Sequence, residues 1–284
     1  AKMTQPVHRL MNSGLGMPLD IFMSSSERIR PQQAHVFSIS AIKDFTLGKD
    51  VYSFSTEAFY KQMKRILSFQ DGFDTRSVIY NAQGGAFRTE NIHDALTTGE
   101  GQSTGIEIMA EKKNGLVNGW ISYTWSKTDN RFDELNEGQW FPALQDRRHV
   151  FNVFANLDIT KRWHLSLTYM FLSGQPVNIP AYSFPSMDTG TENGLIISDG
   201  DYIYGYEGRN SSRMKDFHKL DVSSGISYSI GRAKGQIDIG LYNALNRRNA
   251  SFYYLGKTPE HKTPVVKSVS MFPIIPSIAL RMQF

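Results

Sequence analysis

The feature that most constrains this chain is an alternation of apolar and polar residues with a period of two, which recurs along nearly its whole length. Between Tyr52 and Lys61, the even positions carry Tyr, Phe, Thr, Ala and Tyr, whereas the odd positions include Ser, Ser, Glu and Lys. Successive side chains of a β-strand point to opposite faces, so this period predicts strands with one apolar and one polar face. Eight further segments alternate in the same way: 34–44, 106–111, 121–126, 151–158, 163–171, 219–230, 237–241 and 277–284. We therefore expect about nine strands, with a tenth ending near Leu10.

A soluble β-sandwich also alternates, so the period alone does not separate a sandwich from a membrane barrel. Many of the predicted strands reach about 12 residues, whereas strands of soluble sheets usually have about five or six. A tilted strand needs about 9–11 residues to cross a bilayer. Aromatic residues stand near the ends of the apolar faces, as Tyr52 and Tyr60 do, which is where interfacial girdles of barrels fall.

The connections between the predicted strands alternate in length. Short connections rich in Gly, Lys and Asn fall at 46–50, 113–117, 160–162 and 231–235. Long ones fall between them, at 67–103, 127–147, 173–213 and 246–262. Membrane barrels have short periplasmic turns and long outer loops. The pattern predicts an all-β fold, an antiparallel up-and-down transmembrane β-barrel, with the C-terminus on the periplasmic side.

Composition excludes several other classes of protein. No segment approaches the roughly 18 unbroken apolar residues of a membrane helix. The chain has no cysteine, which excludes disulfides and thiolate metal sites. Its net charge of +4 comes without a dense basic cluster, so we expect no nucleic-acid partner. No apolar signal segment follows Ala1, so we expect an exported chain that is either mature or a fragment.

The C-terminal segment resembles the strand by which outer-membrane barrels engage the barrel assembly machinery. Such a machine needs an edge strand with a fixed apolar register, which it can pair by strand addition. The alternative is a soluble edge strand that ends in Phe. The expected assembly signal consists of Ile278, Leu280, Met282 and Phe284.

Several short segments resemble, in order, the C-terminal half of TonB-dependent outer-membrane receptors, which are 22-stranded barrels. Two departures occur late in the chain, where Ala244 replaces the usual leucine and Leu245 the usual aromatic residue. The matching segments cover nearly the whole chain: 6–10, 12–16, 18–22, Arg28-Ile29-Arg30-Pro31-Gln32, Glu57-Ala58-Phe59-Tyr60-Lys61, Gly105-Ile106-Glu107, 119–124, Asp146-Arg147-Arg148-His149 and Tyr242-Asn243-Ala244-Leu245-Asn246.

This resemblance implies uptake of a scarce, bulky nutrient across the bacterial outer membrane, energised through the TonB complex. The nutrient classes include iron-siderophore, haem, cobalamin, oligosaccharide and peptide. Because the sequence has no plug domain or TonB box, we expect residues 1–284 to be an incomplete C-terminal portion of about 9–10 strands. Its partners are then the lipid bilayer, the missing barrel strands and the plug. Two alternatives are a passive porin and a complete ten-stranded barrel acting as a surface protease.

Charged residues on the polar faces have two interpretations. They form a cross-strand ladder on a wet inner wall, where each pair contributes about 0.2–1 kcal/mol, or they contact the plug; the two can coexist. These residues are Glu57, Lys61, Glu107, Glu111, Asp221 and Arg281.

The outer loops hold the residues that we expect to contact a ligand, because binding residues concentrate in loops. Aromatic rings suit sugars, haem or chelates, and Tyr and Arg add directional polar contacts; the alternative is that these aromatic residues pack the loops against each other. Asp199, Asp201 and Glu207 are a weaker option for binding Ca²⁺. No nucleotide, zinc or catalytic motif is present, so we expect no cofactor and no enzyme activity. The expected ligand contacts are Trp140, Phe141, Tyr202, Tyr204, Tyr206 and Arg209.

Overall fold

The fold was analysed in a computed structural model, which describes residues 1–10, 20–70, 95–188, 196–231, 233–258 and 264–283. Phe284, the last residue of the expected assembly signal, lies outside this part. The described chain is built almost entirely of β-strands, with one 3₁₀ turn, η1 (Asn136–Gly138). No helix in these residues is long and apolar enough to cross a membrane.

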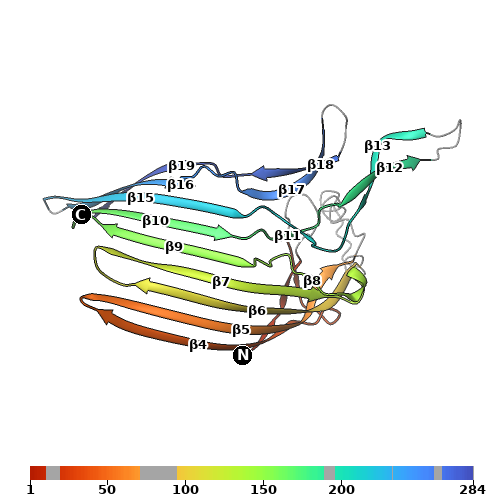
Figure 1. Ribbon diagram of the computed structural model, residues 1–284, viewed down its shortest axis with the longest axis horizontal. Helices are drawn as coiled ribbons and strands as arrows, with labels where there is room; N and C mark the ends of the chain where they lie inside the picture. Colours follow the sequence, from red (N-terminus) through yellow and green to blue (C-terminus); the bar gives the residue numbers. More distant parts are fainter. Residues whose placement is uncertain (11–19, 71–94, 189–195, 232, 259–263, 284) are drawn as a thin grey trace.

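Eleven strands form one antiparallel sheet, shown edge to edge in Figure 1. Ten of them lie side by side in chain order, and β8 (Phe141–Pro142) pairs with the end of β7. The ten are β1 (Lys2–Gln5), β4 (Gln32–Leu47), β5 (Asp50–Phe69), β6 (Leu96–Lys112), β7 (Val117–Arg131), β9 (His149–Asp158), β10 (Trp163–Leu172), β15 (Phe217–Ile230), β16 (Ala233–Tyr242) and β19 (Ile275–Gln283). The predicted all-β, antiparallel up-and-down architecture is confirmed.

The prediction that the tenth strand of the sheet ends near Leu10 is wrong. The segment that ends at Leu10 is β2 (Val7–Leu10), which leaves the sheet and pairs with β3 (Ile21–Ser24). The tenth strand of the sheet is instead β1, which pairs with the start of β4. Pro6 separates β1 from β2, and proline has no N–H to donate to a sheet. The chain changes direction there.

The sheet is open at both edges. β1 covers only the first residues of β4, at Gln32–His35, and β19 pairs with β16 on one side. Within the described residues, β1 and β19 do not pair with each other. A closed small barrel would join its first and last strands, so the fold is a segment of a wall rather than a closed ring.

All short turns lie at one end of the sheet and all long connections at the other (Figure 1). The turns after β4, β6, β9 and β15 have two to four residues, as the strand bounds show. The long connections carry additional short strands: β11 (Pro176–Val177) with β14 (Ser212–Arg213), β12 (Tyr182–Asp188) with β13 (Ile196–Gly205), and β17 (Ala250–Lys257) with β18 (Pro264–Ser270). The predicted alternation is confirmed. We call the second end the loop end.

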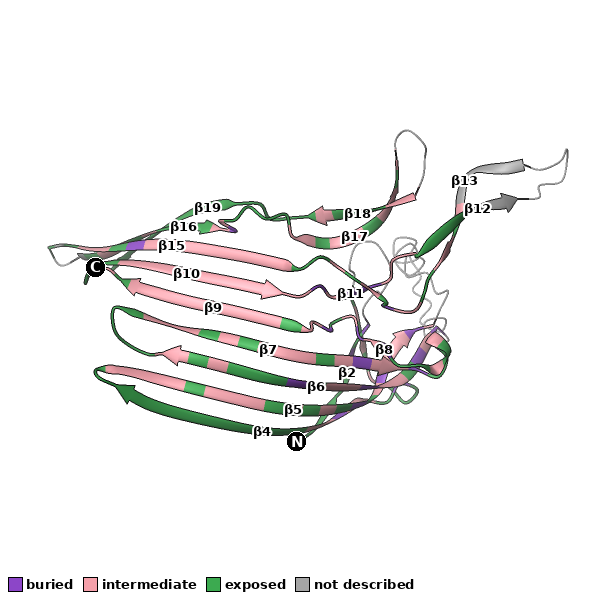
Figure 2. Cartoon of the chain, in the orientation of Figure 1, coloured by how far each residue is buried: buried purple, intermediate pink, exposed green. Residues whose placement is uncertain are grey.

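The apolar face of the sheet is exposed rather than packed. Ile39 and Ile278 are both 77% exposed, and Ile121 in a central strand is 50% exposed. Figure 2 shows that most residues of the sheet are intermediate or exposed, with the buried ones gathered near the loop end. Among the described residues, no second sheet covers this face. The arrangement therefore differs from a β-sandwich, whose inner faces bury one another.

A small core closes the loop end of the polar face. It joins Met63 and Ile66 of β5 to Phe132, Leu135 and Phe141 in the connection after β7, with Ala34 at the start of β4. Phe132 and Phe141 stack with ring centroids 6.0 Å apart. This packing holds the connection between β7 and β9 over the end of the sheet.

Candidate functional site

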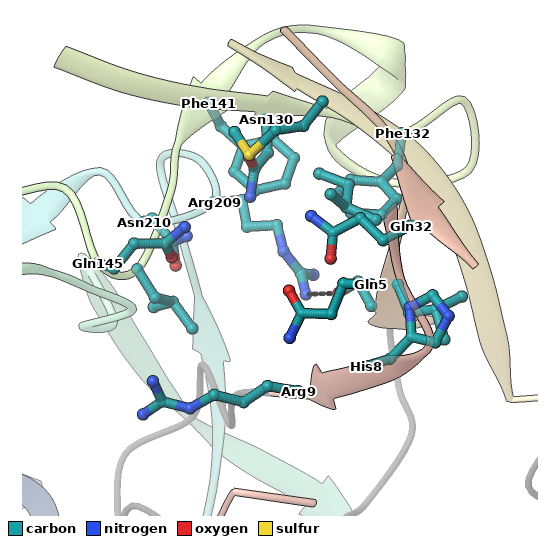
Figure 3. Close-up of a pocket in the computed structure, with 15 residues that line it drawn as sticks. Gln5, His8, Arg9, Gln32, Asn130, Phe132, Phe141, Gln145, Arg209 and Asn210 are labelled. Atoms are coloured by element: carbon teal, nitrogen blue, oxygen red, sulfur yellow. Dashed lines mark hydrogen bonds between the residues drawn. The ribbon is translucent and has the colours of Figure 1, made fainter. Parts of the chain in front are cut away.

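A polar pocket of about 310 Å³ lies on the inner side of the loop end, where β2, β5 and the connections after β7 and β13 meet. Figure 3 shows side chains from these separate elements pointing into one hollow. Its polar lining consists mainly of carboxamides and cations, and no acidic residue of the described chain lines it. The polar side chains are Gln5, His8, Arg9, Gln32, Ser68, Asn130, Gln145, Arg209 and Asn210.

Arg209 reaches into this pocket from the connection after β13 (Figure 3). Its guanidinium lies 5.6 Å from the centroid of the Phe141 ring and donates a hydrogen bond to Ser68 Oγ at 3.3 Å. Its backbone N–H donates to Asn136 Oδ1 at 3.1 Å. Arg209 thus presents positive charge inside the pocket.

Phe141 and Trp140 lie on opposite sides of the wall, although they are neighbours in the sequence. Phe141 is opposite Asn130 in the β7–β8 register, is 5% exposed and lines the pocket. Trp140 is 40% exposed, and the Arg131 guanidinium lies 5.4 Å from its ring. Alternation along the strand explains the split. The structure brings Phe141 and Arg209 together and leaves Trp140 outside the pocket.

The three predicted tyrosines belong to the hairpin of β12 and β13, away from the pocket lining. Tyr202 and Tyr204 are in β13, and Tyr206 follows it with 49% of its surface exposed. Burial of the hydroxyl raises the pKa of Tyr206, with a smaller contribution from neighbouring Tyr204. The hairpin projects beyond the end of the sheet (Figure 1). None of the three tyrosines lines the pocket.

Three residues that line the pocket carry side-chain atoms without a hydrogen-bond partner in the described structure: His8 Nδ1, Asn130 Oδ1 and Asn210 Oδ1. His8 is 1% exposed and Asn210 is 3% exposed. Burial lowers the pKa of His8, against a smaller opposing effect of a backbone hydrogen bond at Arg30. Buried polar groups are normally paired. These atoms are therefore the ones that a bound polar solute would satisfy.

The Asp-Arg-x-His motif directly follows Leu144 and Gln145, which line the pocket. The carboxylate of Asp146, with no exposed side-chain surface, pairs with Arg148 at 3.1 Å and with Arg213. It also accepts a hydrogen bond from the Thr128 backbone N–H at 2.8 Å. Burial lowers the pKa of neighbouring Arg147, whose guanidinium donates to Ser173 O and Gln175 Oε1. The motif ties three connections of the loop end together.

The Tyr-x-x-x-Asn motif ends strand β16 in a similar way. Asn243 is 1% exposed and has a left-handed φ of 51°. Its amide donates to the backbone carbonyls of Arg247 and Phe272, each at 3.0 Å. Asn246 Oδ1 accepts from the Ile274 backbone N–H at 3.1 Å. Asparagine tolerates this conformation and satisfies backbone groups on both sides of the turn.

The predicted wall charges share the polar face but do not form the expected ladder. Glu57 stands directly opposite Glu107 in the β5–β6 register, and like charges in that position repel. Glu111 is opposite Ser53, and Lys61 is opposite Ser103. In the described residues, only Asp221 of the predicted set makes an ion pair, with Lys219 at 2.8 Å. Arg281 is opposite Gln236.

The expected assembly strand is β19, at one open edge of the sheet. Ile278, Leu280 and Met282 are 77%, 62% and 49% exposed, all on the apolar face. For the Ca²⁺ option, the side chains of Asp199 and Asp201 are outside the described part. Among the side chains that are described, no group of three His, Asp or Glu residues is placed to hold a metal ion.

Sequence reasoning missed most of the pocket lining. Gln5, His8, Gln32 and Asn130 come from β1, β2, β4 and β7. His8 and Gln32 lie in segments that carry the family resemblance, but nothing in those segments marks either residue as part of a pocket. The only available signal was the basic residue Arg9 in a segment with strand character. Its guanidinium pairs with Asp20 at 2.6 Å.

No family model matches this sequence, and a comparison with curated proteins finds no match. Among solved structures, the chain is similar to the closed form of the ferric-catecholate import receptor Fiu from E. coli K12. The TM-score is 0.47 with 11% sequence identity, and the alignment covers 90% of this chain and 28% of that receptor. This chain thus corresponds to under a third of that receptor's length. Likeness at this level assigns neither a family nor a ligand.

Proposed function

We propose that this chain forms part of the wall of a TonB-dependent outer-membrane transporter, which takes up a scarce, bulky nutrient and carries out no covalent chemistry. One observation carries the proposal: a single-layer up-and-down sheet whose apolar face stays exposed while its opposite face is polar. In water, such a surface of ten strands would be an aggregation hazard. In a bilayer, it is the face that meets lipid.

The two open edges support a wall larger than this chain. An exposed edge of a long strand offers a row of unpaired N–H and C=O groups, which membranes do not tolerate. β4 has 16 residues and β19 has nine, so both edges are long. Further strands pairing with β4 and β19 would close a wide barrel around a plug, as the motif resemblance implies.

The inner face supports the presence of a plug. Glu57 and Glu107 stand opposite each other without an ion pair in the described chain. A cationic group on a plug would relieve their repulsion, and polar contacts suit a domain that must move during transport. We assign Glu57, Lys61, Glu107 and Glu111 to this contact.

The pocket supports ligand capture at the loop end. Arg209, Phe141 and the unpaired atoms of His8 and Asn210 offer positive charge, an aromatic face and unused hydrogen bonds. The tyrosine hairpin of β12 and β13 provides further contacts outside it. The ligand would be held here before it passes along the wall.

The test is uptake by cells that carry or lack the gene, with and without a functional TonB complex. A panel of radiolabelled iron-siderophores, haem, cobalamin, oligosaccharides and peptides is supplied at limiting concentration. We expect the protein in the outer-membrane fraction and one nutrient class whose uptake requires both the gene and TonB. Uptake that persists without TonB indicates the passive porin. A protein recovered outside the outer membrane contradicts the proposal.

A further inference from the structure

A bulge in β5 places two cations beside each other on the lipid side of the wall. The β5–β6 register shifts between Lys64 and Ile66, and the extra residue is Arg65, with φ of 60°. A non-glycine residue in the left-handed region costs free energy, and bulges commonly re-aim side chains. Ile66 resumes the alternation on the inner face, in the core at the loop end. Arg65 is thereby left beside Lys64.

Lys64 and Arg65 line a hollow of about 360 Å³ together with Arg131. Arg131 pairs with Glu100 at 2.6 Å and lies over the ring of Trp140. The side chains of Lys64 and Arg65 make no hydrogen bond or ion pair with any described residue. Three cations face two acids there, Glu100 and Asp133, so the hollow has a net positive charge.

The hollow lies just beyond the apolar band. Along the outward face of β5 the band runs from Tyr52 to Tyr60, and Lys64 follows four residues later. Four residues span about 13 Å along a strand, or about 9 Å along the membrane normal for a strand tilted by about 45°. That distance corresponds to the headgroup layer rather than the acyl chains. Trp140 sits at the same end, as interfacial tryptophans do.

We propose that this hollow binds the phosphate monoester headgroup of a lipid in the outer leaflet. Arg65 and Arg131 supply planar donor groups that match phosphate oxygens, and Lys64 adds a compact charge. The Glu100 carboxylate would repel a bound phosphate, but its pairing with Arg131 offsets this repulsion. In this proposal, the bulge has a role: despite the unfavourable φ of Arg65, it brings a second cation to the lipid side, beside Lys64. This inference rests on the proposed membrane location, but not on transport.

The test uses the purified full chain in neutral detergent micelles. Phosphatidic acid, diacylglycerol with the same acyl chains, and inorganic phosphate are titrated separately, and binding is measured by native mass spectrometry. The test variant is Lys64→Gln with Arg65→Gln. The matched control is Lys49→Gln with Lys161→Gln, which removes two exposed lysines from the short turns at the opposite end.

We expect phosphatidic acid to bind and diacylglycerol not to bind. The test variant should bind phosphatidic acid about thirtyfold more weakly, because each cation at an anionic lipid surface contributes about 1 kcal/mol. The control should bind as the parent does. Equal binding by the test variant, or binding of inorganic phosphate as tight as that of phosphatidic acid, overturns the proposal.

A second variant separates binding from a structural role of the bulge. Arg65→Gly relieves the left-handed φ, so it should raise the unfolding temperature by roughly 2 °C while weakening phosphatidic acid binding. A purely structural Arg65 would show no loss of lipid binding. TonB-dependent uptake by the Lys64→Gln, Arg65→Gln variant is measured in parallel. If no nutrient of the panel requires the gene and TonB for its uptake, the proposed transport function fails. The result for the lipid site, which is measured on purified protein, is not affected by that failure.

Discussion

Arg213 reaches across 67 residues of chain to donate a hydrogen bond to the buried carboxylate of Asp146. The same guanidinium donates to the backbone carbonyls of Asp146 and Gly174, at 3.2 and 2.9 Å. Because Arg148 and the Thr128 N–H also meet this carboxylate, one side chain fastens three connections of the loop end. We therefore regard Asp146 as the anchor on which the pocket depends.

Replacing Asp146 by Asn should destabilise the protein by about 2–3 kcal/mol, because the two guanidinium groups lose their charged partner while part of their surface remains hydrated. The free energy of unfolding in detergent, from urea titration, measures the effect. Asp133→Asn is the control, since Asp133 is exposed, and its change should stay within about 0.5 kcal/mol. Equal effects of the two substitutions would remove Asp146 from its anchoring role.

His8 should make stability depend on pH. Burial lowers its pKa below the ordinary value of 6.5 in the folded chain. As the pH falls below about 6.5, the unfolded chain binds a proton that the folded chain rejects, so stability decreases toward acid pH. His8→Gln should remove this part of the slope, measured as the free energy of unfolding between about pH 7.5 and about pH 5.5, one unit on either side of the ordinary pKa. An unchanged slope would show that His8 does not titrate as proposed.

Two glycines near the end of the sheet that carries the short turns allow a matched test of the pairing between β7 and β9. Gly119, with φ of +147°, would place a Cβ 2.1 Å from the backbone oxygen of Phe154, whereas Gly48, with φ of +64°, has open space around it. Gly48→Ala should cost about 1 kcal/mol for backbone conformation alone. Gly119→Ala adds a clash with the neighbouring strand and should cost roughly 3 kcal/mol or more. Thermal unfolding compares them, and a smaller loss for Gly119→Ala would contradict the β7–β9 pairing.

Arg209 should govern ligand uptake. Once the nutrient class is known, Arg209→Gln should raise the half-saturating concentration roughly tenfold, since a charge-assisted hydrogen bond contributes about 1.5 kcal/mol. Arg248→Gln, an exposed arginine in the connection after β16, is the control. The two variants are compared at equal amounts in the outer membrane. Uptake unaffected by Arg209→Gln would place the ligand elsewhere at the loop end.

The sheet could be predicted from the sequence because its signal is local. Ile121 and Ser122 differ in polarity because they face opposite sides of one strand, and each strand repeats that signal independently of the others. Turn residues such as Gly48 and Gly231, both with positive φ, mark the short connections in the same local way. The strand near Leu10 was misplaced because β1 and β2 have similar patterns, and only pairing partners distinguish them.

The candidate site could not be predicted to the same extent, because long-range packing creates it. His8 and Asn210 line the same pocket although they are 202 residues apart in the sequence, and the local sequence marks neither of them as a pocket residue. The side chains of Trp140 and Phe141 point in opposite directions because β8 pairs with β7. β8 has only two residues, and no sequence pattern indicates it. The bulge at Arg65 likewise appears only once the register with β6 is known.

The proposal of a membrane wall depends on what surrounds each face of the sheet. The chain has no cysteine, so Ile121→Cys and Ser122→Cys each give a single labelling site. A polarity-sensitive fluorophore is attached at each site in membrane-embedded protein, and quenching by brominated acyl chains is compared with quenching by aqueous iodide. We predict that the probe at position 121 is quenched by the lipid and the probe at 122 by iodide. Iodide quenching of equal strength at both positions would contradict a membrane wall.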